Sequence, residues 1–498
     1  MRPKLQLLDN QLVTRILDEA FHLLASLGTK VGAPEAIELL GSAGATCENG
    51  IARIPKDLVQ RALESVPREF FLHDRSGSKV VHYGGDDVHF DPGSSCLKIL
   101  DSETQQPRLA ASADLVRLVQ VAEMLPQYAA QSTAMVCNDV PSEIGDWYRL
   151  LLVLWYSGKP VVTGAFSAAT LKIMIELLAA DSRGADQLRR KPRAVFDVCP
   201  SPPLNWSEFA AHNMIELARA GVPAEIVSMP LAGATAPVTL AGAIVQHAAE
   251  CLAGITIHQL AKPDAPVVWG GAPAIFDMAT GNTPMGAVET AMLDMGCAQV
   301  GKSLGLPTHG YLVATDGQQI DTQAGMESSG SAFLGSLAGI NMISGAGMLD
   351  FLACHSIEKL VIDAEAISSA QRLISGIQAQ TESLALEMFA KTGLHGDFLK
   401  LKETRALFRK EQHFPSAVID RSGDANAPDI LERARRRVQE LIESYCKPVV
   451  PSEVEAALLE IAMREAGAIG MKNLPAVEFE RGEDWQFVAS QLTRSERH

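Results

Sequence analysis

The spacing of hydrophobic residues along the first hundred positions indicates short helices followed by short strands. Leu12, Ile16 and Leu24 fall on one face of a helix that ends near Gly28. The expected helices lie at 11–27, 34–43 and 56–65, and the expected strands at 70–72, 80–83 and 88–90. We therefore predict an N-terminal segment, residues 1–100, made of helices and a small sheet.

From about residue 130 the pattern changes to apolar, β-rich runs separated by helix-length spacers. Strands without polar alternation are typical of a parallel sheet covered on both faces. Eight runs with a repeat of roughly 30–40 residues favour an α/β fold of the (β/α)8 TIM-barrel type, which we assign to residues 101–370. A doubly wound open sheet is the alternative that periodicity leaves open. The runs lie at 133–136, 160–165, 194–198, 224–229, 266–269, 308–314, 340–343 and 359–362.

The remaining residues, 371–498, form a helical and charged C-terminal segment. Residues 429–445 carry apolar side chains on one face, and residues 451–466 open with Pro451 and continue as an amphipathic helix. We expect this segment to pack on the barrel. A contact between copies in a homo-oligomer is the alternative.

Composition and charge narrow the class of protein. A formal net charge of −16 over 498 residues argues against nucleic acid or a membrane surface as a partner. No run reaches the roughly 18 apolar residues that span a bilayer, and the start lacks the apolar stretch of a signal peptide. Eight cysteines are scattered without a CxxC motif, which indicates reduced thiols and a cytoplasmic protein.

Aromatic residues occur after several predicted strands, where a barrel places its active site. They are Phe166, Trp206, Trp269 and Phe276, in a chain that is only 5% aromatic. An aromatic face attracts a quaternary ammonium ion by roughly 0.5–2 kcal/mol. These four rings are therefore candidates for substrate binding. The alternative is that each ring only packs at the top of the barrel.

Carboxylates follow the same strands. Asp316, Asp321 and Glu327 come after the sixth run and are the catalytic candidates, with Asp197 and Asp277 behind them. A carboxylate can balance or orient a bound cation. Asp321 and Glu327 have an alternative role, because negative charge also stabilises the N-terminus of a following helix.

Glycine-rich loops allow the backbone to approach a ligand closely. Gly270, Gly271, Gly345 and Gly347 are the candidates for cofactor or phosphate binding. Motifs of other catalytic classes, such as GxSxG, HExxH and the P-loop, are absent from the sequence.

Four scattered residues near the predicted strand ends have side chains of the kind that bind zinc. They are Cys199, His309, Cys354 and His355. Neither a CxxC nor an HxH spacing supports a metal, and the last two residues are expected inside a helix. We therefore predict no metal site.

Several motifs resemble those of the trimethylamine methyltransferase family. The most specific block covers 230–271 and includes 230–242, Gln246, His247 and Glu250. The resemblance extends over nearly the whole chain. Further matching segments are 106–110, 159–161, 264–270, 321–327, 363–365 and 393–399.

The resemblance implies a barrel that binds a methylated amine and passes one methyl group to cob(I)alamin on a separate corrinoid protein. Family members that act on trimethylamine carry pyrrolysine near the end of the sixth strand. The pattern that includes Asp316, Asp321 and Gln323 aligns that position with Gln319. The chain therefore resembles members without pyrrolysine, which include those that demethylate quaternary amines such as glycine betaine. Gln319 is a further substrate-binding candidate.

The chemistry of a quaternary amine agrees with this interpretation. Attack by cob(I)alamin on its methyl group expels a neutral tertiary amine, so the protein must only hold the cation, align one methyl group and exclude water. No tightly bound cofactor is expected. Alternatives are transfer from a tertiary amine or a sulfonium, a barrel lyase that binds phosphate through the glycine loops, and a binding protein without catalysis.

Overall fold

Eight parallel strands lie at the centre of the structure, a computed structural model that describes residues 2–394 and 396–475. They are β6 (His89–Pro92), β9 (Gln131–Ser132), β10 (Val161–Gly164), β11 (Ala194–Val198), β13 (Ala224–Ser228), β15 (Val267–Gly271), β17 (His309–Tyr311) and β18 (Met342–Ala346). Five of them pair in the order β15-β13-β11-β10-β9, and three in the order β17-β18-β6. The fold is therefore mixed α/β with parallel sheets.

The two parallel sheets also contact each other along both outer edges. Trp269 of β15 forms a parallel bridge with Thr308, which directly precedes β17. On the other side, the Ala129 amide donates to the Phe90 carbonyl of β6 at 3.0 Å, two residues before β9 begins. All eight strands run in the same direction, so their carboxyl ends lie at one end of the strands.

Six of the eight predicted runs overlap observed strands, whereas the first run lies just after β9. The eighth prediction is wrong, because residues 359–362 belong to the helix α12 (Ile357–Ile374). A short apolar run does not distinguish a strand from the buried face of a helix. The strand missed by that prediction is β6, which pairs with β18. The predicted division at residue 100 therefore separates strands that pair with each other.

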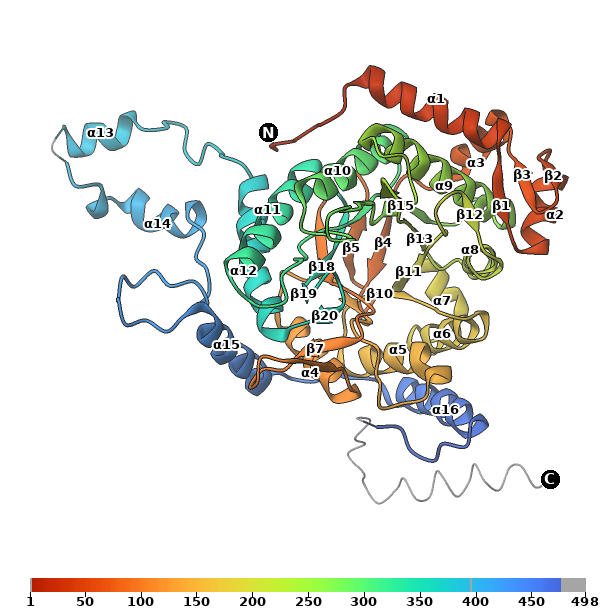
Figure 1. Ribbon diagram of the computed structural model, residues 1–498. Coiled ribbons are helices and arrows are strands. Elements are labelled where there is room, and N and C mark those ends of the chain that lie inside the picture. Colours follow the sequence, from red (N-terminus) through yellow and green to blue (C-terminus); the bar gives the residue numbers. More distant parts are fainter. Residues whose placement is uncertain (1, 395, 476–498) are drawn as a thin grey trace.

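Helices surround the strands in Figure 1. They are α4 (Ser112–Met124), α5 (Gly145–Tyr156), α6 (Ala168–Asp181), α7 (Ala185–Arg190), α8 (Glu208–Ala220), α9 (Leu240–Ala261), α10 (Val288–Ser303), α11 (Thr322–Ala338) and α12, with the 3-10 turn η1 (Ser142–Ile144) before α5. Local sequence fixes several of their ends. The side chains of Ser167, Ser207 and Ser356 accept backbone N–H groups at the starts of α6, α8 and α12. Gly221 and Gly339 end α8 and α11 in the left-handed conformation.

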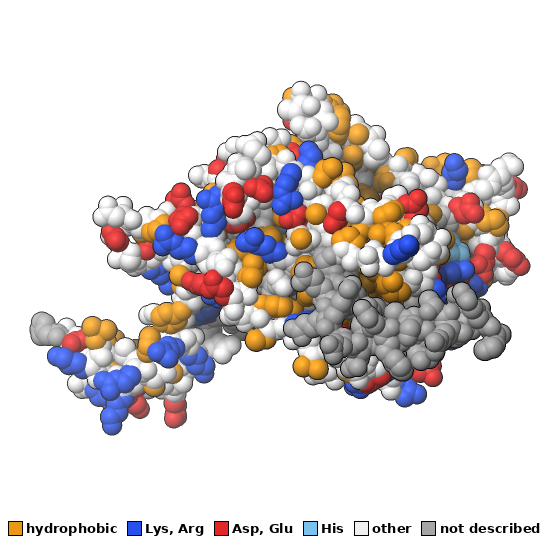
Figure 2. Space-filling view, turned by 90° about the horizontal axis from the view of Figure 1, so that it is seen from below, with side chains coloured by type: hydrophobic (Ala, Val, Ile, Leu, Met, Phe, Trp, Pro, Cys, Tyr) orange, Lys and Arg blue, Asp and Glu red, His pale blue; other side chains and the backbone are white. Residues whose placement is uncertain are grey.

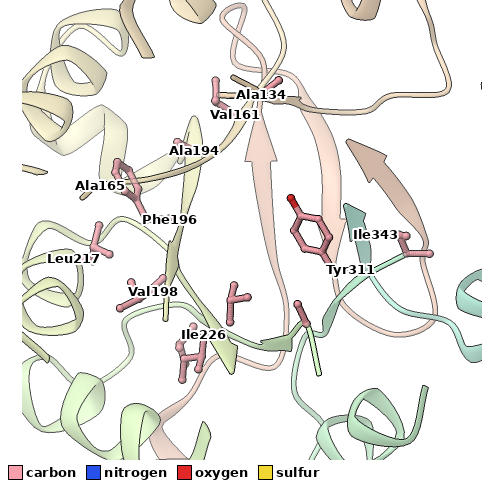
Figure 3. Close-up of a cluster of buried hydrophobic side chains, with 14 of the residues drawn as sticks. Ala134, Val161, Ala165, Ala194, Phe196, Val198, Leu217, Ile226, Tyr311 and Ile343 are labelled. Carbon is pink, nitrogen blue, oxygen red and sulfur yellow. The ribbon is translucent and has the colours of Figure 1, made fainter. Parts of the chain in front are cut away.

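The helix α9 is an exception to the expectation that no segment of the chain is long and apolar enough to span a bilayer. By length and composition α9 could cross a membrane, but 83% of its most apolar window is buried inside the protein. It contacts α1 (Asn10–Ser26), α3 (Lys56–Ser65), α8 and α10. Burial to this extent is typical of a helix in the core of a protein. The buried side chains between strands and helices, including those of Val161, Phe196 and Ile226, appear in Figure 3.

The N-terminal segment forms the three predicted helices and the predicted strands at 70–72 and 80–83, together with a small sheet whose strands the sequence did not predict. The helices α1, α2 (Pro34–Ser42) and α3 confirm the predicted ones, and β1 (Thr29–Val31), β2 (Thr46–Glu48) and β3 (Ile51–Arg53) form a small sheet with β12 (Asn205–Trp206). The hairpin of β4 (Phe70–His73) and β5 (Lys79–Tyr83) follows. Its Leu72, Val81 and Tyr83 pack against Val162 and Val268, which lie near the amino ends of β10 and β15. The hairpin therefore covers the amino end of the parallel strands.

Shorter strands follow the carboxyl ends of the parallel ones. One sheet contains β7 (Lys98–Leu100), β8 (Pro107–Leu109), β19 (Met348–Leu349) and β20 (Cys354–His355), and β14 (Leu231–Ala232) pairs with β16 (Ala274–Ile275). The prediction that Cys354 and His355 lie inside a helix is therefore wrong.

The C-terminal segment packs on the outer helices and also forms a projecting arm. The helix α15 (Ile430–Ser444) contacts α4 and α12, and α16 (Ser452–Ala468) contacts α5 and α6. The arm contains α13 (Leu386–Thr392), η2 (Phe398–Lys400) and α14 (Lys402–Glu411), none of which has a buried residue. It stands away from the body in both views (Figures 1 and 2).

Candidate active site

Three carboxyl groups from three of the parallel strands meet inside these strands. Asp197 of β11 and Glu225 of β13 are register partners, so their side chains lie on the same face. The next residue, Ile226, points the other way, toward Gly254 of α9. Glu225 and Asp197 therefore point inward, away from the surrounding helices. Asp91 of β6 is the third member, and we call these three residues the acidic cluster.

Hydrogen bonds connect the acidic cluster to side chains of three other strands. The Tyr83 hydroxyl donates to Glu225 Oε2 at 3.0 Å, and His309 Nδ1 lies 3.4 Å from Glu225 Oε1. His309 Nε2 lies 3.0 Å from the Ser344 hydroxyl, which donates to Asp91 Oδ1 at 2.6 Å. Asp197 lies beside Glu225 as its register partner on the neighbouring strand. The three carboxyl groups thus belong to one network.

The acidic cluster has little compensating positive charge. Burial raises the pKa of Asp197 to about 7, and burial together with the Asp197 carboxylate raises the pKa of Glu225 well above its ordinary value. Burial also raises the pKa of Asp91 and lowers that of His309 to about 3, so this histidine stays neutral. Among residues 2–394 and 396–475, no Lys or Arg forms an ion pair with the cluster.

Several polar atoms of the cluster lack a hydrogen-bond partner, and one of its carboxyl groups is partly exposed. Asp91 Oδ2, Asp197 Oδ1 and His309 Nδ1 are buried and make no hydrogen bond within the described chain. An unpaired buried polar atom costs free energy unless a partner binds there. Asp197 is also only half-buried, and Cys199, two residues farther toward the carboxyl end, is exposed. Asp197 is therefore the least buried of the three carboxyl groups, and it lies toward the carboxyl end of β11.

The predicted tryptophans lie in a different layer. The Trp269 indole N–H donates to the Cys297 carbonyl of α10 at 2.9 Å, and its ring lies against Gly301. The Trp206 N–H donates to the Glu250 carbonyl of α9 at 3.2 Å. Both rings are buried between strands and helices. In this position they cannot form the walls of an aromatic cage around the acidic cluster.

The two predicted phenylalanines lie nearer the surface. Phe166 follows β10 and is 62% exposed, with the Arg149 guanidinium 5.2 Å from its ring centre. Phe276 follows β16 and is half-buried. Tyr311 of β17, which the sequence did not single out, lies closer to the cluster. Its hydroxyl accepts a hydrogen bond from the Ser94 amide at 2.7 Å, and the charges of Asp197 and Asp91 act on its pKa.

The position of Trp269 gives a test of its role. Trp269→Ala is expected to lower the free energy of unfolding by about 3–5 kcal/mol, because it leaves a cavity between β15 and α10. Urea denaturation followed by circular dichroism measures this change. Phe166→Ala is the aromatic control and is expected to change stability little. Equal stability of Trp269→Ala and the parent, with weaker binding of a quaternary ammonium ion, would instead assign the ring to the ligand.

The carboxylates predicted after the sixth run hold loops and a helix end. Asp316 Oδ1 accepts the amides of Met285 and Gly286 at 2.7 and 3.1 Å, and Glu327 Oε2 accepts the Asp316 amide at 2.9 Å. Asp321 is the N-cap of α11, as the capping alternative describes.

Two other candidates lie on exposed loops. Asp277 binds the Thr280 hydroxyl within its own loop at 2.6 Å. Gln319 is exposed on the loop that follows β17.

The predicted glycines are tightly packed against other residues of the chain. A Cβ atom at Gly270 would lie 3.0 Å from the His309 side chain, and one at Gly271 would lie 2.4 Å from that of His247. Gly345 and Gly347 have φ angles of +121° and +84° and lie against Leu312 and His355. Close packing of strands and helices explains their small size. The described residues contain no group of three His, Cys, Asp or Glu side chains that could hold a metal ion.

Sequence reasoning missed Asp91 and Glu225 as site residues, although one signal was present. Glu225 stands second in a run of otherwise apolar residues, and Asp197 stands fourth in the preceding run. A carboxylate is rarely placed in a fully buried strand without a partner or a function. These exceptions to the apolar pattern could have identified Glu225 and set Asp197 apart from the other candidate carboxylates.

Comparisons with known proteins identify relatives along most of the chain. The family model described as trimethylamine methyltransferase (MTTB) matches residues 1–470. Glycine betaine methyltransferase from Desulfitobacterium hafniense (strain Y51) is 27% identical over 475 residues, which cover 94% of this chain and 98% of the relative. Trimethylamine methyltransferase MttB from Methanosarcina barkeri is 31% identical over 444 residues, covering 85% and 88%.

A solved structure has a similar fold. The monomethylamine methyltransferase of Methanosarcina barkeri superposes with a TM-score of 0.52 at 11% sequence identity, over 88% of this chain and 89% of that one.

Proposed function

This chain belongs to the trimethylamine methyltransferase family and is a methyltransferase, and from its site we propose that it moves an N-methyl group from a quaternary, betaine-like amine to the cob(I)alamin of a partner corrinoid protein. The observation that carries the substrate assignment is the acidic cluster, which lacks a counter-charge. Membership of a methyltransferase family argues against the two alternatives of a barrel lyase and a binding protein without catalysis. We further propose a cytoplasmic location.

The eight parallel strands, in our proposal, form one closed (β/α)8 barrel. Support comes from the contacts that join both outer edges of the two sheets, at Trp269 with Thr308 and at Ala129 with Phe90. In such a barrel the active site lies at the carboxyl ends of the strands. The half-buried Asp197 is reached from that end.

A quaternary ammonium ion fits the acidic cluster for an electrostatic reason. The ion has no N–H group, so it is held by charge and by contact instead of by directed hydrogen bonds. A buried carboxylate attracts such a cation strongly because little water screens it. Asp197 is the carboxylate that solvent reaches, and Glu225 and Asp91 lie behind it. We assign Asp197 to contact with the cation and the other two to the electrostatic field around it.

The loops beyond the carboxyl ends form a surface suited to a partner protein. Phe166, Met229, Val238, Met278 and Met326 are exposed there. Exposed methionine and aromatic side chains mark protein contacts more often than an ordinary surface. Since all five follow parallel strands, they lie at the end from which the acidic cluster is reached. A corrinoid protein docked on this rim would bring the methyl acceptor to the substrate.

The roles of the chain's own residues then follow from their positions. Cob(I)alamin, carried by the partner, supplies the nucleophile that takes the methyl group. The acidic cluster holds the cation, and Tyr311 borders it. The rim closes against the partner and excludes water, which strengthens the electrostatic interactions inside. The Gln319 loop lies beside this entrance.

A reconstituted assay tests the proposed function. The purified chain with glycine betaine alone is expected to give no demethylated product, because the methyl group has no acceptor. With a corrinoid protein under reducing conditions, the corrinoid absorbance should change and dimethylglycine should form. Trimethylamine should be inert, because Gln319 stands where relatives that use it carry pyrrolysine. Faster transfer from trimethylamine or from a sulfonium would contradict the substrate assignment.

A further inference from the structure

The acidic cluster cannot carry three negative charges in the absence of a ligand. Asp197 and Glu225 are register partners on neighbouring strands, the charge of Asp91 acts on Glu225, and the charge of Asp197 acts on Asp91. Like charges at such separations, without water or a cation between them, disfavour ionisation. The ligand-free cluster therefore holds protons near neutral pH, and a bound cation would favour their loss.

We propose that the acidic cluster exchanges a proton in each catalytic cycle, releasing it when the quaternary amine binds and regaining it when the amine becomes neutral. This inference rests on the proposed function. It makes Asp197 the charge-compensating residue of the reaction. It also has support beyond acidity alone, since Asp91 Oδ2 is buried at the cluster without a hydrogen-bond partner and the relatives include methyltransferases named for trimethylamine and glycine betaine.

The proton and electron balance closes over one cycle. On binding, the cation replaces a carboxyl proton, which passes to solvent. In the transfer step the C–N bond breaks, and its electron pair stays on nitrogen, giving a neutral tertiary amine. The acceptor contributes the electron pair of the new bond to the methyl carbon. The carboxylate that remains has lost its counter-charge, so it takes a proton from solvent as the amine leaves.

The other titratable groups that face the cluster do not take part near neutral pH. Burial lowers the pKa of His309 to about 3, and the protein atoms around the Cys199 sulfur, together with the charges of Asp197 and Glu225, raise the pKa of this thiol to about 12. Burial also raises the pKa of Tyr83 and Tyr311. No Lys or Arg of the described ranges pairs with the cluster. The exchangeable proton therefore belongs to the carboxyl groups, and Asp197 beside the exposed Cys199 is its route to solvent.

Calorimetry with the full chain measures the proton directly. Tetramethylammonium and glycine betaine are titrated into the protein in buffers of different ionisation enthalpy, without corrinoid. Since the pKa of Asp197 is about 7, close to one proton should be released per cation at pH 6, and the number should fall toward zero above pH 8. Asp197→Asn should lose this pH-dependent release. Asp57→Asn, which removes an exposed carboxylate of α3 away from the site, should retain it.

The possible results separate the two proposals. Binding whose heat is the same in every buffer at pH 6 would overturn the proton exchange and leave the methyltransferase proposal intact. Methyl transfer in the complete assay without any cation binding by the free chain would also overturn it. Absence of both binding and transfer with every onium probe would instead reject the proposed function. The wild-type measurement decides these cases even if Asp197→Asn fails to fold.

Discussion

Asp197→Asn is expected to lower kcat/KM for a quaternary amine by about 10²-fold, which corresponds to about 2.7 kcal/mol. The loss should appear mostly as a higher KM. The carboxylate attracts the full positive charge of the substrate, but that charge disappears as the C–N bond breaks. Removal of the carboxylate therefore weakens substrate binding more than it destabilises the transition state. Initial rates from the corrinoid absorbance change, at several amine concentrations, give both constants.

The pH profile provides a second measurement of the same effect. A cation binds the ionised form of Asp197, so kcat/KM should fall as the pH drops through the pKa of about 7 in the free protein. The fall should approach tenfold per pH unit on the acid side. Asp57→Asn, in the distant helix α3, should keep the wild-type profile. An unchanged KM and pH profile in a correctly folded Asp197→Asn protein would show that the substrate does not contact this carboxylate.

The sequence predicted the parallel strands better than the side chains that make the site. The runs at 194–198 and 224–229 match β11 and β13 closely, because buried parallel strands are continuously apolar. By contrast, β6 was not recognised as part of the same set of strands. The predicted strand ends at Phe90, but β6 continues through Asp91 and Pro92. These two residue types are unusual in a buried core strand.

The aromatic candidates show why site geometry could not be predicted in the same way. Trp206 and Trp269 lie at strand ends in the sequence, as an active-site residue would. A one-residue shift along a strand, however, moves a side chain from the inner to the outer face. Trp269 falls on the outer face, and its neighbour on the inner face is Gly270. The sequence ranks Asp197 below Asp316 and Asp321 as a catalytic candidate, because no local pattern shows which carboxylates lie close together in the fold.

Lys359→Met is expected to lower the free energy of unfolding by about 3–5 kcal/mol, since it leaves a carboxylate buried without its counter-ion. Lys359 and Asp363 are fully buried in α12, with Nζ and Oδ2 2.6 Å apart. Lys359 Nζ also donates to the Ser328 hydroxyl of α11 at 2.8 Å, and Asp363 Oδ2 accepts the Gly347 amide at 2.7 Å. Three elements therefore depend on this ion pair. Urea denaturation curves measure the loss.

The exposed ion pair of Lys400 and Asp397 provides the matched control, because Lys400→Met makes the same chemical change where water screens the charges. That variant should unfold at the wild-type urea concentration. The double variant Lys359→Met with Asp363→Asn should recover part of the loss, since no uncompensated charge is then buried. If Lys359→Met alone is as stable as the control, Asp363 must be protonated in the folded protein. The short contact would then be a hydrogen bond to a neutral carboxyl group, and α12 would be held on the strands by apolar packing alone.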